Sequence, residues 1–154
     1  AAGARVPGGH DHIVVAGPQL DEDRFARAQA LAGPSTTVVR SCPGLAHRIR
    51  EAAAVVAMGG YNTVCEILAT STPALIVPRE KPRLEQAIRA RALSRASAID
   101  TARQQAATPD LLSQWLAGAV RSRTDRSHVE LGGLAAAARA ATRLLTRTPE
   151  GEPA

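Results

Sequence analysis

A pair of glycines stands where an apolar run passes into a helical pattern, within Met58 to Glu66 (MGGYNTVCE). Residues 54–57 before it are apolar at successive positions, which is typical of a strand buried on both faces. Glycine lets the backbone turn sharply and approach a ligand, and the free N–H groups of a helix start attract anions. The pattern predicts a diphosphate site at Gly59, Gly60, Tyr61, Asn62 and Thr63. The alternative is a tight strand-to-helix turn without a ligand.

Glu66, one turn further along the helical pattern, has two interpretations. Thr63 and Glu66 fit a capping box, in which the carboxylate only satisfies the start of the helix. Asn62 is an equally good cap, however, and would release Glu66 to face the crevice. A carboxylate there is better suited to accept hydrogen bonds from sugar hydroxyls than to lie against a phosphate.

A second polar segment, residues 79–86 (REKPRLEQ), follows the next apolar run. Arg79 and Lys81 have the charge to contact phosphate, and Glu85 and Gln86 stand at a helix start with oxygen and amide groups that suit sugar hydroxyls. Because both segments follow predicted strands, we expect them at the same edge of a parallel sheet. A solvated loop with charges of alternating sign is the alternative.

Short apolar runs and helical patterns alternate along the chain, which predicts an α/β fold of the Rossmann-like type: a three-layer arrangement with one parallel sheet and helices on both faces. The predicted strands are residues 13–16, 36–39, 54–58, 74–77 and a short fifth at 97–99. The predicted helices are residues 21–32, 45–52, 63–70, 84–96, 108–120 and 131–145. Asp21, followed by Glu22 and Asp23, is expected to cap the first, and Thr108, followed by Pro109, the fifth. The fourth should turn Leu84, Ala87, Ile88 and Ala92 inward, and the last should bury Leu134, Ala138, Ala141 and Leu145.

The chain is expected to form one domain over residues 12–147. Residues 1–11 are interpreted as a loop or the remnant of a preceding element, and residues 148–154 as a disordered tail. Because residue 1 is alanine, we expect a processed, trimmed or fragmentary chain.

Composition argues against several other classes of protein. The net charge of +5 is spread along the chain and aromatic residues make up only 2%, which disfavours nucleic-acid binding by stacking. His10, Asp11 and His12 lack a further ligand cluster, so no metal or other cofactor is expected. No apolar run has the length of a membrane span. The two cysteines form no disulfide scaffold, which favours a reducing, cytoplasmic location.

Met58 to Glu66, the following residues 67–78 and the pair Glu85-Gln86 resemble the C-terminal, donor-binding domain of family 28 GT-B glycosyltransferases, a group that includes predicted bacterial enzymes. The resemblance is most specific over residues 54–93 and extends over residues 12–146. It implies an enzyme that transfers a hexose or N-acetylhexosamine from a nucleotide-diphosphate sugar, with UDP as the expected nucleotide.

The resemblance also implies roles for individual residues. Gly60, Tyr61, Asn62 and Thr63 would hold the diphosphate, and Glu66 would bind the ribose. Glu85 and Gln86 would meet the sugar, while the turn from Cys42 to Leu45 would lie along the base.

Two features of such enzymes have no counterpart in the sequence. The family's first strand is not found, and neither is the N-terminal domain that would bind the acceptor and carry the catalytic base, so the catalytic residues stay unknown and this piece alone is expected to be inactive. A nucleotide-sugar epimerase and a non-catalytic nucleotide-binding module are the alternatives.

Overall fold

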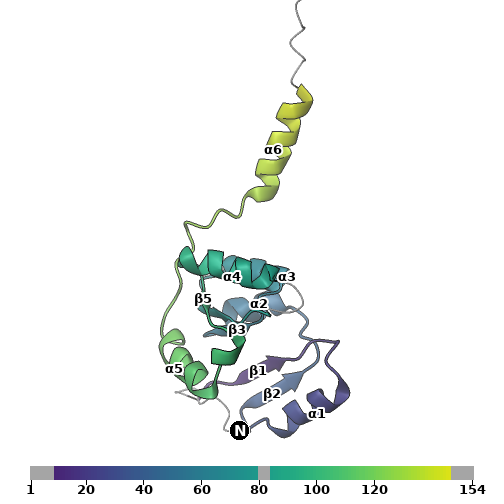
Figure 1. The fold of residues 1–154 in the computed structure, drawn as a ribbon, viewed down its shortest axis with the longest axis vertical. Helices are drawn as coiled ribbons and strands as arrows, with labels where there is room; N and C mark the ends of the chain where they lie inside the picture. Colours follow the sequence, from purple (N-terminus) through teal and green to yellow (C-terminus); the bar gives the residue numbers. More distant parts are fainter. Residues whose placement is uncertain (1–8, 80–83, 147–154) are drawn as a thin grey trace, which may run out of the picture.

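The computed structural model describes residues 9–79 and 84–146, and Figure 1 shows how strands and helices alternate along this part of the chain. The strands are β1 (His12–Val15), β2 (Thr36–Val39), β3 (Val55–Ala57), β4 (Ala74–Ile76) and β5 (Asp100–Thr101). The helices are α1 (Glu22–Ala30), α2 (Leu45–Glu51), α3 (Tyr61–Leu68), α4 (Glu85–Arg95), the 3-10 helix η1 (Gln104–Ala106), α5 (Pro109–Ala119) and α6 (Gly133–Thr146).

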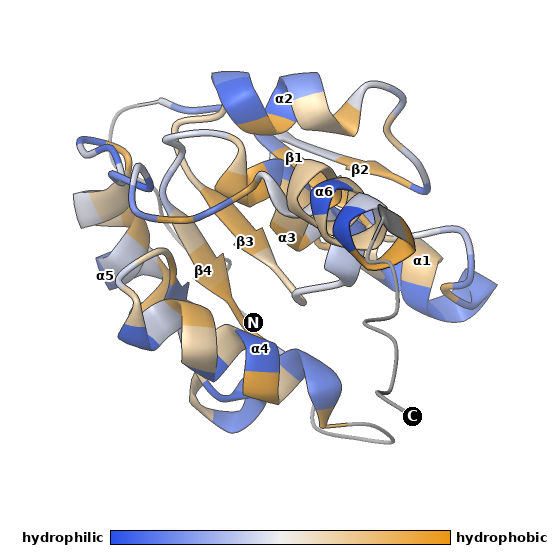
Figure 2. Cartoon of the chain, turned by 90° about the horizontal axis from the view of Figure 1, so that it is seen from above, coloured by the Kyte–Doolittle hydropathy of each residue, from blue (hydrophilic) through white to orange (hydrophobic). Residues whose placement is uncertain are grey.

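All of the strand pairs are parallel, and helices lie on both sides of them, with α2 and α4 on opposite sides of β3 and β4 in Figure 2. The predicted α/β class is therefore confirmed. The expectation of one continuous sheet was wrong, because β1 pairs only with β2, and β3, β4 and β5 form a second sheet in that order. Figures 1 and 2 place β1 between β2 and β3, so the two sheets lie edge to edge. The edges of β1 and β3 that lie next to each other are not paired by hydrogen bonds.

The hydrophobic core surrounds β4, the only described strand with a partner on each side. All three residues of β4 are buried, and the side chains of α2, α3, α4 and the turn before β5 pack around it. The buried members of this cluster are Ile49, Ile67, Ala74, Ile76, Ala90 and Ile99. The sheet of β3, β4 and β5 thus supports both segments that the sequence marks as functional.

Strand β1 is much less enclosed than its composition predicts. Ile13, Val14 and Val15 are 48%, 44% and 39% exposed. The apolar run of β1 suggested a strand buried on both faces, and this is wrong: among the described residues β1 is hydrogen-bonded only to β2, at the edge of a two-stranded sheet.

Two helix starts confirm the capping pattern of the sequence. The Asp21 carboxylate accepts a hydrogen bond from the Arg24 N–H at 2.9 Å, and Glu22 and Asp23 follow in the first turn of α1. At α5 the Thr108 hydroxyl accepts from the Leu111 N–H at 3.3 Å, with Pro109 as the first helical residue.

Other predicted faces and boundaries were wrong in part. In α4 Ala87 is buried as predicted, but Leu84 and Ile88 are 61% and 64% exposed and Ala92 is exposed as well, whereas Ala90 is buried. The helix thus packs against the sheet through its small residues. The fifth strand is Asp100–Thr101 and not residues 97–99, because Ser97 adopts a positive φ of 55° and ends the helical region before the chain enters the sheet.

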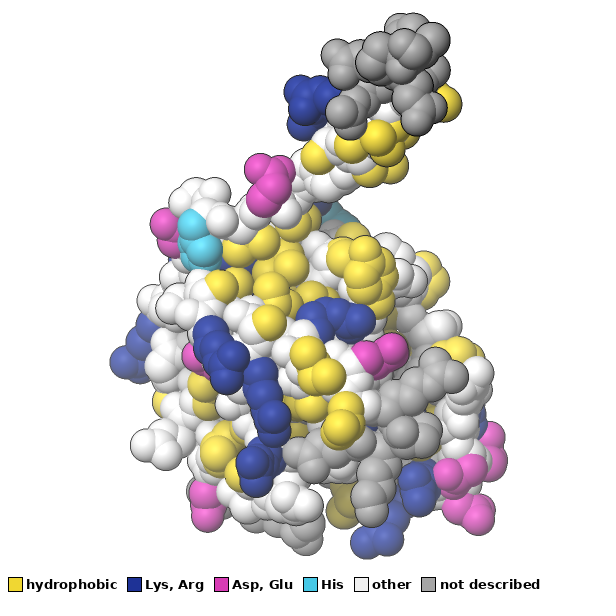
Figure 3. Space-filling view, turned by 45° about the horizontal axis from the view of Figure 1, so that its top comes forward, with side chains coloured by type: hydrophobic (Ala, Val, Ile, Leu, Met, Phe, Trp, Pro, Cys, Tyr) yellow, Lys and Arg dark blue, Asp and Glu magenta, His cyan; other side chains and the backbone are white. Residues whose placement is uncertain are grey.

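Helix α6 forms where a helix was predicted, but it stands away from the rest of the molecule (Figures 1 and 3). Leu134 and Leu145 are 89% and 87% exposed, and Ala138 and Ala141 are exposed as well. The prediction that they pack inward was therefore wrong, since an amphipathic pattern shows that a face is apolar without showing what covers it.

Arg126 ties the loop after α5 to the core. Its guanidinium donates to the carbonyl groups of Ala98, Thr70 and Thr72 at 2.7, 2.7 and 2.9 Å. Burial lowers the pKa of Arg126 from its ordinary value. Nothing in the residue pattern around Arg126 indicates a buried side chain.

Candidate functional site

The two glycines after β3 have different structural roles. Gly59 has a φ of +81°, and a Cβ there would lie 2.7 Å from Cγ2 of Ile76, so both the backbone and the core exclude a side chain. Gly60 has a φ of −55° and open space where a Cβ would be. Gly59 therefore makes the turn, and Gly60 leaves room above the start of α3.

Helix α3 begins one residue after the glycine pair. Gly60 is its N-cap, and the Val64 N–H makes the first intrahelical bond, to the Gly60 carbonyl at 2.9 Å. The N–H groups of Tyr61, Asn62 and Thr63 therefore have no acceptor within the helix. No side chain caps this start and no acidic residue lies in its first turn, in contrast to α1. The arrangement suits an anion.

The capping roles considered for Asn62 and Thr63 were wrong, because both residues lie inside α3. Thr63 is the third helical residue, so it cannot form a capping box with Glu66. The glycine cap begins the helix earlier than the spacing of capping side chains indicates.

Glu66 faces inward from the second turn of α3. Its Oε2 is enclosed and has no hydrogen-bond partner among the described residues. A buried carboxylate oxygen without a donor is costly in a folded protein. This oxygen is thus free to accept a hydrogen bond from a hydroxyl group brought by a ligand.

Arg89 connects α4 to the glycine turn, and the sequence interpretation missed it. Its guanidinium donates to the Gly59 carbonyl at 3.2 Å and lies 5.3 Å from the centre of the Tyr61 ring. The signal was present in the sequence, because Arg89 follows Glu85 by four residues and so lies on the same side of the helix. Arg89 brings positive charge to the start of α3.

The second predicted segment comes to the same edge of the sheet. Val77, just after β4, donates its N–H to the Ala57 carbonyl at 2.8 Å, which holds the end of β4 beside the end of β3. The Arg79 N–H donates to Oε1 of Gln86 at 3.2 Å, so Gln86 supports this loop while its amide N–H groups stay available. Glu85 is exposed in the first turn of α4. Lys81 lies outside the described residues.

The predicted base pocket follows β2. Cys42 is a free, half-buried thiol in the turn before α2. Leu45, the first residue of α2, packs against the core, and α2 contacts α3. Since β2 is parallel to β1 and β3 to β4, these residues lie at the carboxyl ends of their strands, as the glycine turn does.

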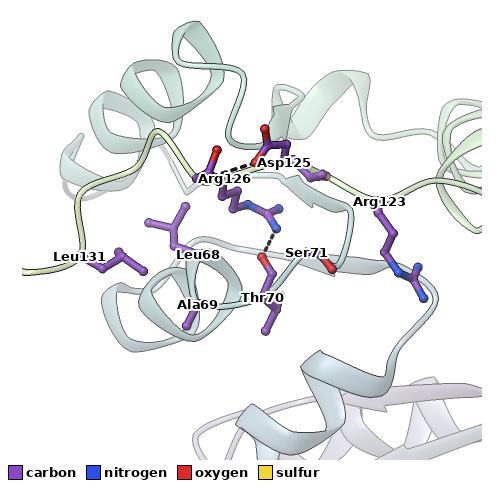
Figure 4. A pocket seen from close by; sticks show the side chains of 10 residues that line it. Leu68, Ala69, Thr70, Ser71, Arg123, Asp125, Arg126 and Leu131 are labelled. Carbon is purple, nitrogen blue, oxygen red and sulfur yellow. Dashed lines mark hydrogen bonds between the residues drawn. The ribbon is translucent and has the colours of Figure 1, made fainter.

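A hollow lies at the end of the strands opposite to the glycine turn. This cavity of about 450 Å³ is formed by the turn between α3 and β4 and by the loop around Arg126 (Figure 4). Figure 4 shows Arg126 directed at Thr70, in accordance with its hydrogen bond to that carbonyl. The guanidinium of Arg126 is thus engaged in structure, and the cavity shares no residue with the glycine turn.

Within residues 9–79 and 84–146, no group of three or more His, Cys, Asp or Glu side chains could hold a metal ion. None of the helices described there is both long enough and apolar enough to cross a membrane.

A parallel α/β domain with an uncapped helix start after β3 has the architecture in which ligands bind at the carboxyl ends of the strands. Residues 13–142 match the model of the glycosyltransferase family 28 C-terminal domain, and the chain belongs to that family. This confirms the resemblance seen in the sequence.

Two solved structures share the fold. The crystal structure of Acinetobacter baumannii MurG matches with a TM-score of 0.67 and 21% identity over 90% of this chain and 42% of that one. The glycotransferase of kitacinnamycin matches with a TM-score of 0.54 and 16% identity over 78% of this chain and 37% of that one. The chain thus spans less than half of either protein. A comparison with curated protein sequences finds no match.

Proposed function

We propose that this chain is the donor-binding domain of a glycosyltransferase that takes a hexose or N-acetylhexosamine from a nucleotide-diphosphate sugar, with UDP as the nucleotide. The observation that carries the proposal is the start of α3, where three N–H groups lack acceptors among the described residues and the first turn contains no acidic side chain. Membership of the family supports the same assignment.

In this proposal the diphosphate lies over Gly60 and receives hydrogen bonds from the N–H groups of Tyr61, Asn62 and Thr63. Arg89 adds a guanidinium beside the turn. During transfer, negative charge develops on the diphosphate as the bond to the sugar breaks. Donors that are already aimed at that position stabilise the charge without reorganising.

The remaining residues orient the nucleotide and the sugar. Glu66 accepts from the ribose hydroxyls with the oxygen that lacks a partner. The turn from Cys42 to Leu45 borders the base, and Glu85 and Gln86 meet the sugar, with Arg79 and Lys81 beside the phosphates. Holding the donor in one orientation contributes to the rate through proximity.

We assign the binding of the acceptor and the catalytic base to another domain. We place the protein in the cytoplasm, where the thiols of Cys42 and Cys65 would stay reduced. Since helix N–H groups and arginine supply the positive charge, we propose that no metal is required for the donor to bind.

The proposal is tested by calorimetric titration of the chain with UDP and with UMP. We expect saturable binding of UDP that is tighter than that of UMP by about tenfold or more, because the second phosphate adds charge-assisted hydrogen bonds. EDTA should leave the affinity for UDP unchanged. Equal affinity for UDP and UMP, or no binding of either, would contradict the assignment of the diphosphate to α3.

A further inference from the structure

A second hollow lies between α4 and the segment that follows β5. Its volume is about 370 Å³, and three of the side chains around it are arginines. The lining residues are Pro78, Ala87, Arg91, Arg95, Thr101, Ala102 and Arg103. None of them belongs to the glycine turn or to the predicted donor-binding set.

Two of the arginines come from one face of α4. Ala87, Arg91 and Arg95 follow each other at intervals of four residues, so their side chains are stacked along the helix. Ala87 is small and buried, which leaves the space in front of it open. Two like charges four residues apart repel each other, and a bound anion would relieve that repulsion.

The third arginine approaches from the chain after β5. The Thr101 hydroxyl and the Ala102 N–H both donate to the Ile76 carbonyl, at 3.0 and 3.1 Å. These bonds hold the segment against the end of β4 and place Arg103 beside α4. The pocket therefore stands at the carboxyl edge of β4 and β5, where open parallel sheets bind ligands.

Within residues 9–79 and 84–146, no hydrogen bond or ion pair joins the side chain of Arg91, Arg95 or Arg103 to another residue, and no acidic side chain from these residues lines the pocket. The neighbouring Asp100 is engaged elsewhere, because its Oδ2 accepts from the Trp115 indole N–H at 2.7 Å.

Other arginines of the chain have partners. Arg40 binds Glu22 and the Leu20 carbonyl, and Arg126 binds three carbonyl groups. Arg91, Arg95 and Arg103 differ from these arginines because their side chains have no partner among the described residues, although all three line the same pocket. On the face that Figure 3 presents, basic side chains gather in a short band.

We propose that this arginine pocket, formed by Arg91, Arg95 and Arg103, binds the phosphate or pyrophosphate group of a second ligand, separate from the nucleotide at α3. Guanidinium groups bind phosphate oxygens through paired, charge-assisted hydrogen bonds. Three of them without an acidic competitor match a doubly charged group better than a carboxylate.

The test is a titration of the isotope-labelled chain with inorganic pyrophosphate, followed by amide chemical shifts in NMR spectra at constant ionic strength. We expect saturable shifts at Arg91, Arg95 and residues 101–103. Shifts at residues 60–63 report the separate diphosphate site at α3, so the two proposals succeed or fail independently. If the unmodified chain shows no shifts at the arginine pocket, or shifts that do not saturate, the proposal is overturned.

A matched pair of variants separates a site from general attraction to a basic protein. Replacing Arg91, Arg95 and Arg103 with glutamine should weaken binding at residues 101–103 by at least about tenfold. Replacing Arg27, Arg50 and Arg121, which are exposed and lie outside the pocket, removes the same charge and should change it less than about twofold. An equal loss in both variants would overturn the proposal.

The source of the phosphate is found by sedimentation with phosphatidylcholine vesicles that contain or lack phosphatidylglycerol. Retention on the anionic vesicles that is lost in the pocket variant would assign the site to a lipid headgroup. Binding of pyrophosphate without retention on vesicles would assign it to a soluble phosphate.

Discussion

At the scale of single residues, a substitution of Glu66 distinguishes most clearly between a binding role and a structural role. The sequence left a choice between a capping box and a crevice carboxylate, and the start of α3 at Tyr61 removes the first. A side chain that neither caps the helix nor pairs through its enclosed oxygen contributes little to stability in the ligand-free protein.

We therefore expect Glu66→Gln to weaken UDP binding by about tenfold while the free energy of unfolding stays within about 1 kcal/mol. Calorimetry and urea denaturation measure the two quantities. Glu51→Gln, at an exposed glutamate of α2, serves as the control and should leave UDP binding unchanged. A parallel loss of stability and affinity in Glu66→Gln would instead indicate a structural carboxylate.

Substitutions of Gly59 and Gly60 likewise distinguish a structural role from a binding role. Gly59→Ala should destabilise the protein by at least about 2 kcal/mol, because the left-handed backbone and the contact with Ile76 both oppose a Cβ. Gly60→Ala should cost less than about 1 kcal/mol, since its backbone suits alanine and its Cβ meets open space. Gly60→Ala should nevertheless weaken UDP binding, because the methyl group occupies the approach of the phosphate.

Thermal unfolding and UDP titration of the two variants check this prediction. Equal destabilisation by both substitutions would show that the turn tolerates no side chain at either position. If Gly60→Ala binds UDP as tightly as the unmodified chain does, the phosphate does not lie over Gly60.

At the scale of elements, the sequence predicted those parts of the fold that depend on local chemistry. Asp21 and Thr108 act as caps where their side chains and the following acidic or proline residues indicated. The run of residues 74–77 contains the most deeply buried strand. Such signals are contained within one helix or one strand, so they survive in any tertiary context.

The wrong expectations concern relations between elements. An amphipathic helix pattern identified the apolar face of α6 but not whether another surface covers it. The composition of β1 suited a central strand, yet pairing depends on which strands stand beside it. The candidate site shows the same division, because the glycine turn is encoded in a local run of residues, whereas the contact of Arg89 with that turn depends on how α4 packs beside it.

At the scale of the whole molecule, the unpaired edges of β1 and β3 are the main departure from the expected architecture. In a parallel strand, alternate residues direct their N–H groups to opposite sides. His12 and Ala16 donate to the β2 side, to Ser35 and Val39, at 2.7 and 2.9 Å. Ile13 and Val15 therefore direct theirs toward the side of β3, where the described residues place no pairing strand.

We expect the amides of Ile13 and Val15 to exchange with deuterium at least about a hundredfold faster than those of β4, which has a strand on each side. Exchange mass spectrometry at residue resolution measures the effect. Slow exchange at Ile13 and Val15, comparable to that of β4, would contradict the prediction and show that the edges of β1 and β3 pair directly with each other in solution.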